Sequence, residues 1–88
     1  MHAVVIPAQF NDKSAARSEL DGLVSRISNM PGFIAGYWVA MPGDRGTAMI
    51  VFDSQDAAQR FVVSVRSGPP FYSMNLGSVE VGEVWAHA

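Results

Sequence analysis

Apolar residues change their spacing repeatedly along this chain, and each change marks a predicted structural element. Strict alternation of apolar and other residues is typical of strands, and apolar residues at i, i+3, i+4 and i+7 are typical of amphipathic helices. The predicted strands cover residues 2–10, 33–41, 47–53 and 79–87, and the predicted helices cover residues 14–30 and 54–66. The chain therefore predicts the order β-α-β-β-α-β.

This order is that of the ferredoxin-like α+β fold. We expect one domain over residues 1–88, because 88 residues provide only one hydrophobic core. The expected antiparallel sheet has the strand order 4-1-3-2, which places the last strand beside the first. We therefore predict that Trp85 and His87 lie close to His2 and Val4.

Local signals support the boundaries of these elements. Asp12 or Ser14 is a suitable N-cap for the first helix, and Ser54 is one for the second. Arg17 falls on the side of the first helix that we expect to face solvent. Pro7 lacks a backbone N–H, which predicts an unpaired or irregular position in the first strand.

The composition indicates that the protein associates with a second copy of itself. Apolar residues make up 49% of the sequence, more than a domain this small buries by itself. An apolar sheet face covered by a second copy is the simplest explanation, and a two-fold symmetric homodimer is the commonest arrangement of that type.

Charge and composition also exclude several classes of function. The net charge is −2 and the six basic residues are scattered, so no stripe is present for binding nucleic acid. The absence of cysteine excludes a disulfide or thiolate site. No apolar stretch is long enough to span a membrane, and the first residues do not resemble a signal peptide. We expect a cytoplasmic protein.

Aromatic residues are the first candidates for a binding site. Aromatic walls with a few polar atoms suit planar organic ligands. The small residues Ala35, Gly36, Gly82 and Ala86 could leave a cavity rather than a filled core. Packing in the core or in a dimer interface is the alternative role for each aromatic residue. The candidate substrate-binding residues are Tyr37, Trp38, Phe52, Phe61, Tyr72 and Trp85.

Two ionisable residues of the last strand are the candidate catalytic groups. Glu83 would become a stronger base if it were buried, and His87 is the other available base. Alternatively, Glu83 pairs with an arginine across a dimer interface. His2 and His87 could bind a metal only with a third ligand nearby, so we predict no metal site and no cofactor.

The segment 69–77 is irregular but too apolar to be a solvated linker. It carries Phe71, Tyr72, Met74 and Leu76 between proline and glycine residues. We predict that it packs over the mouth of a pocket or across a dimer interface, and a plain connection between helix and strand is the alternative.

The sequence resembles small actinobacterial members of the antibiotic-biosynthesis monooxygenase-like group in four stretches, which are residues 31–38, 43–46, 50–58 and 78–88. They correspond to a helix stop, a Gly-Asp-Arg-Gly turn, a strand with the following helix cap, and the last strand. The resemblance implies the dimeric α+β barrel superfamily, in which two sheets of a homodimer close into a barrel.

The resemblance also implies a pocket between sheet and helices. It suggests a cofactor-independent monooxygenase acting on a flat aromatic or polyketide-like substrate, with Glu83 or His87 as the base. Haem-degrading relatives use an Asn on the first strand, a Trp, and a His on the second helix. Here Asn11 lies beyond the first strand and the second helix has no His. The alternative is a non-catalytic homodimer that binds a small apolar ligand or has only a structural role.

Overall fold

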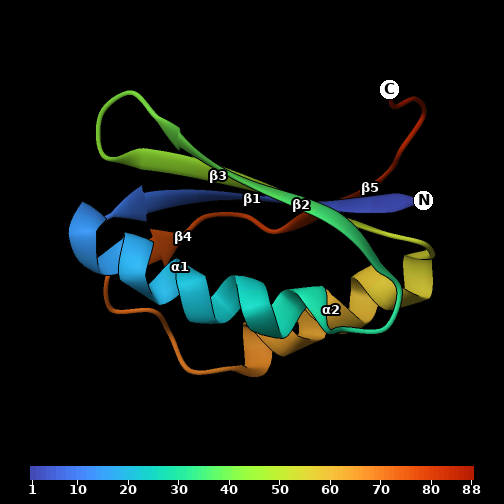
Figure 1. The fold of residues 1–88 in the computed structure, drawn as a ribbon, viewed down its shortest axis with the longest axis horizontal. Coiled ribbons are helices and arrows are strands. Elements are labelled where there is room, and N and C mark those ends of the chain that lie inside the picture. Colours follow the sequence, from blue (N-terminus) through green and yellow to red (C-terminus); the bar gives the residue numbers. More distant parts are fainter.

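The computed structural model describes residues 1–88, in which one antiparallel sheet carries two helices on one of its faces (Figure 1). The elements are β1 (His2–Phe10), α1 (Lys13–Ser28), β2 (Phe33–Met41), β3 (Arg45–Phe52), α2 (Gln55–Ser67), β4 (Met74–Leu76) and β5 (Glu80–Glu83). The sheet order is β2-β3-β1-β4, and β5 also pairs with β1. The predicted ferredoxin-like order is confirmed, with β4 and β5 together at the position of the predicted fourth strand.

Both helices begin at the predicted caps. The Asp12 carboxylate accepts a hydrogen bond of 3.1 Å from the backbone N–H of Ala15, and the Ser54 hydroxyl accepts one of 3.1 Å from Ala57. These bonds satisfy backbone donors that have no partner inside the first helical turn. The helix α1 ends at Ser28, and the chain then turns through Gly32, whose φ of 84° suits glycine.

Pro7 explains why the edge of the sheet is divided. β5 pairs with residues 2–5 of β1, and β4 pairs with residues 8–10. The Pro7 carbonyl accepts a hydrogen bond of 2.7 Å from the N–H of Gly77, so this side of Pro7 faces the connection between β4 and β5. Because Pro7 has no N–H to donate toward the same side, the pairing is interrupted there, as predicted.

The predicted extent of the last strand and its register are wrong. β5 ends at Glu83, and Glu83 rather than His87 lies opposite His2. The last backbone hydrogen bond along this edge joins the N–H of Val84 to the Met1 carbonyl at 3.0 Å. The chain therefore leaves the sheet, and Trp85 and His87 do not pair with β1.

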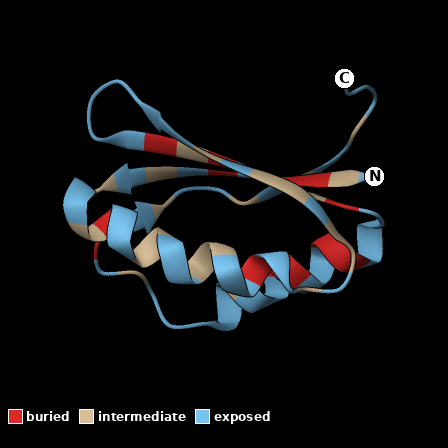
Figure 2. Ribbon diagram, viewed as in Figure 1, coloured by how far each residue is buried: buried red, intermediate tan, exposed pale blue.

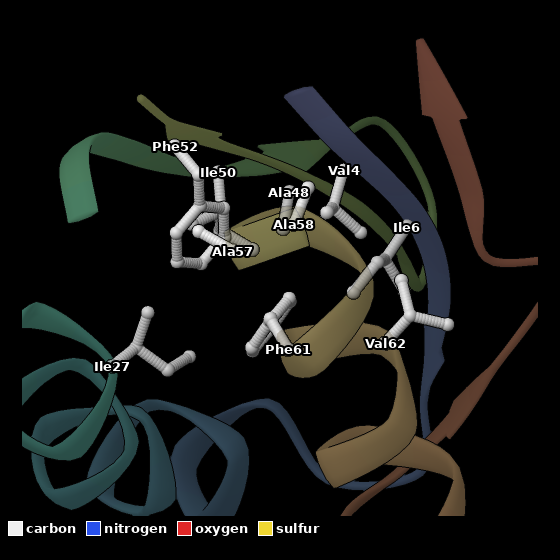
Figure 3. Close-up of a cluster of buried hydrophobic side chains, with 10 residues drawn as sticks. All are labelled: Val4, Ile6, Ile27, Ala48, Ile50, Phe52, Ala57, Ala58, Phe61 and Val62. Atoms are coloured by element: carbon white, nitrogen blue, oxygen red, sulfur yellow. The ribbon is translucent and has the colours of Figure 1, made fainter. Parts of the chain in front are cut away.

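The core lies between the helix-facing side of the sheet and α2 (Figures 2 and 3). Phe52 of β3 is fully buried, and its ring centroid lies 5.5 Å from that of Phe61 on α2. Ile27 is the member of this cluster that α1 contributes. Because most of the cluster comes from the sheet and α2, the space between α1 and the sheet is less completely filled.

The other face of the sheet is not covered by a helix (Figures 1 and 2). Met49 lies at its centre, directly opposite Val5 on one side and Tyr37 on the other, and directly opposite residues share a face. All three side chains are exposed. No helix is long and apolar enough to cross a membrane.

Candidate functional site

A cavity of about 390 Å³ lies between α1 and the sheet, and we call it the aromatic cavity. Strands β1, β2 and β3, both helices, and Phe71 and Leu76 from the chain after α2 contribute to its lining. Of the 20 lining residues, 16 are hydrophobic. Its volume falls in the range of small-molecule sites, roughly 300–1,000 Å³. An apolar lining of this kind binds an apolar organic molecule by removing its surface from water.

Small residues on facing elements create this space. Ala16 of α1 faces Ala8, Gly46 and Ala48 of the sheet, all of which line the cavity. A Cβ atom on Gly46 would lie 2.5 Å from Cζ of Phe10, so glycine allows the Phe10 ring to lie against β3. The cavity thus exists because neighbouring positions carry too few atoms to fill it.

Trp38 forms an aromatic wall of the cavity. It lies opposite Ala48 in the β2–β3 register and therefore on the helix-facing side of the sheet. A Cβ atom on Gly36 would lie 2.6 Å from Cη2 of the indole, so the ring bends back over its own strand. Phe61 of α2 lines the cavity as well. These two rings offer flat surfaces to a planar ligand.

Lys13 and Arg17 are the charged residues of the lining. They are four residues apart on α1 and therefore lie on the same side of the helix. The Lys13 ammonium is 3.8 Å from the Asp44 carboxylate, whereas Arg17 has no carboxylate within ion-pair distance. The largely apolar lining thus includes a guanidinium group that has no carboxylate partner and can pair with an anion.

The other aromatic candidates lie elsewhere. Phe52 is buried in the core, where its ring also makes an edge contact with Phe33 at 6.3 Å between centroids. Tyr37 is 60% exposed on the uncovered sheet face, Tyr72 is 85% exposed, and Trp85 is 91% exposed on the C-terminal tail. In this single chain the cavity brings together only Trp38 and Phe61 of the six predicted residues.

The two candidate bases also lie outside the aromatic cavity. Glu83 and His87 are exposed, and a Glu83 carboxylate oxygen accepts a hydrogen bond of 3.1 Å from Nε1 of Trp85. His2 lies opposite Glu83, and its Nδ1 atom is buried without a hydrogen-bond partner. No group of three or more metal-binding side chains is present.

The two charged residues of the lining, Lys13 and Arg17, were not among the candidates taken from the sequence. Arg17 was expected to face solvent, and its side chain is exposed while still lining the cavity. The helical spacing could have indicated this position in part, because Lys13 and Arg17 share a helical face with Leu20 and Leu23. Phe71 and Leu76 line the cavity too, so the segment after α2 packs over it as predicted.

The fold and this cavity define a ferredoxin-like α+β domain with an internal apolar pocket. No protein-family model matches the chain, and no curated protein matches its sequence. Solved structures do match in fold, and three of them are haem-degrading proteins.

A mutant of MhuD with two manganese protoporphyrin IX molecules bound per active site is 11% identical, with a TM-score of 0.75, and the match covers 100% of this chain and 98% of that one. The haem-free haem-degrading protein of Mycobacterium tuberculosis is 20% identical, with a TM-score of 0.59 and coverage of 100% and 99%. MhuD of Mycobacterium tuberculosis with two haems in its active site is 20% identical, with a TM-score of 0.55 and coverage of 97% and 98%. At these identities the likeness establishes the fold.

Proposed function

We propose that this protein binds a flat aromatic molecule with an anionic group in the aromatic cavity. The observation that carries the proposal is the composition of the lining, in which Thr47 of β3 and the charged residues Lys13 and Arg17 near the N-terminus of α1 are the only polar side chains. The ring system would lie against Trp38 and Phe61, and the anionic group would pair with Arg17. The neighbours of known structure that hold porphyrins support a ligand of this general shape.

The residues present do not fit an iron-ligated haem. The lining contains no histidine, cysteine, methionine or tyrosine to ligate iron. Helix α2 has no histidine, and Asn11 follows the last residue of β1. The proposed ligand is therefore a metal-free aromatic acid.

A cofactor-independent monooxygenase is the second candidate function. It is favoured by the resemblance of the sequence to that family and by the unpaired Arg17 near an apolar cavity, which would stabilise the anion of an electron-rich substrate. In such a reaction a CH₂ group becomes a carbonyl as O₂ supplies one oxygen atom and the other leaves as water. Since Glu83, His87 and Tyr37 lie outside the cavity, binding without catalysis is the better supported function. A substrate in this cavity would have to lose its proton without any of these three residues as the base.

Fluorescence titration tests the binding proposal. Replacing the exposed indole by Trp85→Phe leaves Trp38 as the single tryptophan, and anthraquinone carboxylate is the probe. We expect saturable quenching of Trp38 fluorescence, with the carboxylate binding about tenfold more tightly than the neutral anthraquinone carboxamide. A tenfold difference corresponds to about 1.4 kcal/mol, which is close to the lower end of the usual range of about 1.5–3 kcal/mol for a hydrogen bond to a charged group.

The matched variants are Arg17→Gln and Arg60→Gln. Arg60 is exposed on α2 and lines neither of the cavities described here. Arg17→Gln should remove most of the preference for the carboxylate, and Arg60→Gln should retain it. Absence of quenching, or equal affinity for carboxylate and carboxamide, would contradict the proposal. Oxygen uptake with an anthrone substrate, compared with buffer alone, tests the monooxygenase candidate separately.

We also propose that a second copy of the chain covers the exposed sheet face. Val5, Met49 and Tyr37 form a continuous apolar row there across β1, β3 and β2. The row lies at the middle of the sheet, so a two-fold axis through it would bring the same residues of two copies together. The resemblance to the dimeric α+β barrel superfamily also implies a homodimer, in which the sheets of two copies close into a barrel.

A further inference from the structure

A second cavity of about 350 Å³ adjoins the aromatic cavity, and we call it the strap chamber. It lies between α1, α2 and the strap, which we define as residues 68–73. Half of its 12 lining residues are hydrophobic, so it is more polar than the aromatic cavity. Glu19 and Arg26 of α1 and Ser64 of α2 are among the polar ones.

The two cavities share part of their walls. Five residues line both of them: Leu23, Ile27, Phe61, Val65 and Phe71. Four of these belong to the helices, whose positions the core fixes. Phe71 belongs to the strap and is the one shared residue outside regular secondary structure. Its ring therefore stands at the boundary between an apolar cavity and a more polar one.

The strap is held at both of its ends. At the first end, the Gly68 N–H donates a hydrogen bond of 3.1 Å to the Ser64 carbonyl, and Pro69 and Pro70 restrict the backbone that follows. In Figure 1 the strap then runs from the end of α2 past α1 and returns toward β4. Phe71 follows directly after these two prolines, so little of the chain before it is free to move.

At its other end, the strap is tied to the corner between β1 and α1. Ser73 is 2% exposed, and its carbonyl accepts the N–H groups of Asn11 at 2.8 Å and Asp12 at 3.3 Å. The Ser73 hydroxyl donates a hydrogen bond to the Glu19 carboxylate. The Asn11 side-chain amide also donates to the Tyr72 carbonyl at 3.2 Å. Phe71 is consequently placed between two fixed points.

We propose that Phe71 is a specificity-determining residue that closes the passage between the two cavities and thereby limits the length of the ligand. The proposal rests on the binding function proposed above. An acid held by Arg17 would extend along α1 toward Leu23 and Ile27, which are about 9 and 15 Å further along the helix at a rise of about 1.5 Å per residue. There the Phe71 ring leaves no room for a ligand longer than a rigid three-ring acid. Without this ring, an apolar substituent on the ligand would extend into the strap chamber.

Two probes test this limit, anthraquinone carboxylate and the same acid with a hexyl chain on the ring opposite the carboxylate. We expect the native side chain to favour the short probe by at least about tenfold. Phe71→Ala should reverse this preference, so the ratio of the two affinities is the quantity to compare between the variants. Tyr72→Ala is the matched control, because the neighbouring ring is exposed, and it should leave both affinities unchanged.

A second measurement needs no ligand. The chain has no cysteine, so Ile27→Cys places a single thiol in the shared wall, where residue 27 is buried. We expect Phe71→Ala to accelerate modification of this thiol by a maleimide at least about tenfold, and Tyr72→Ala to have no such effect. Phe71→Leu, which keeps an apolar side chain, serves where the alanine variant does not fold by circular dichroism.

The outcomes separate the two proposals. If neither probe binds the native chain, the binding function fails, and the thiol rates still decide whether Phe71 closes the passage. If the short probe binds but the Phe71→Ala variant has the same relative affinity for the two probes as the native chain, the proposed limit on ligand length is wrong. Equal thiol rates in the Phe71→Ala and Tyr72→Ala backgrounds would also overturn it.

Discussion

At the scale of single residues, glycine and alanine decide whether this protein has a cavity. Gly46 allows the Phe10 ring to approach β3, and Gly36 allows Trp38 to fold over β2. Larger side chains at these positions would force aromatic rings into the space that a ligand would use. The residues that shape the site are therefore not the reactive ones but those that leave room.

Gly46→Ala is the sharpest test of that conclusion. The added Cβ would lie 2.5 Å from the Phe10 ring and 3.3 Å from the Val39 carbonyl oxygen, so the ring must move toward the cavity. We expect a loss of about 1–3 kcal/mol in the free energy of unfolding, typical of overpacking, together with weaker binding of anthraquinone carboxylate. Urea denaturation and the fluorescence titration measure the two effects.

The control is Gly82→Ala, which also places a methyl group on a strand. No atom lies within 4 Å of a Cβ built on Gly82, so this variant should be stable and should bind normally. If both variants bind the probe equally well, the contact between Gly46 and Phe10 does not shape the site.

At the scale of elements, α1 has a good N-cap but a residue of low helix propensity in its interior. Asp12 caps its N-terminus, but Gly22 stands in its interior, where glycine costs about 1 kcal/mol relative to alanine. Because a Cβ on Gly22 would meet nothing within 4 Å, we expect Gly22→Ala to stabilise the protein by about 0.5–1 kcal/mol. Thermal and urea unfolding provide the measurement. A destabilised variant would mean that the exposed side of α1 is covered by something, such as a second copy.

At the scale of the whole molecule, the uncovered sheet face determines the oligomeric state that we expect. Native protein should have twice the 9.5 kDa mass of one chain in light scattering after size exclusion. Met49→Lys places a charge at the centre of the apolar row, where it would be buried without a partner in the dimer, and should yield the monomer.

Val63→Lys is the matched control for this prediction. Val63 is 63% exposed on α2, on the helix side of the molecule, so its replacement should leave the dimer intact. A native protein of 9.5 kDa at micromolar concentration would contradict the dimer, as would a Met49→Lys variant that stays dimeric.

The sequence by itself determined the two helices and the first three strands, because their signals are local. The apolar spacing distinguishes strands from helices, Asp12 and Ser54 cap the helices through atoms three residues away, and Pro7 lacks a donor in any environment. Together with the rule that neighbouring strands in this order pair antiparallel, these signals were sufficient to predict the sheet order.

Only the tertiary structure decided which residues meet at the site. Alternation places Tyr37 and Trp38 on opposite faces of the sheet, but it does not say which of the two faces the helices. The register shift between Phe33 and Ala35 and the pairing of Trp38 with Ala48 of β3 place Trp38 on the helix-facing side. The pairing of β5 with residues 2–5 of β1 likewise places Glu83 opposite His2, and Glu83, Trp85 and His87 do not line the cavity. Phe71 became part of the site through hydrogen bonds to residues about 60 positions away. Such distant contacts leave no periodic trace in the sequence, because they depend on how completed elements pack together.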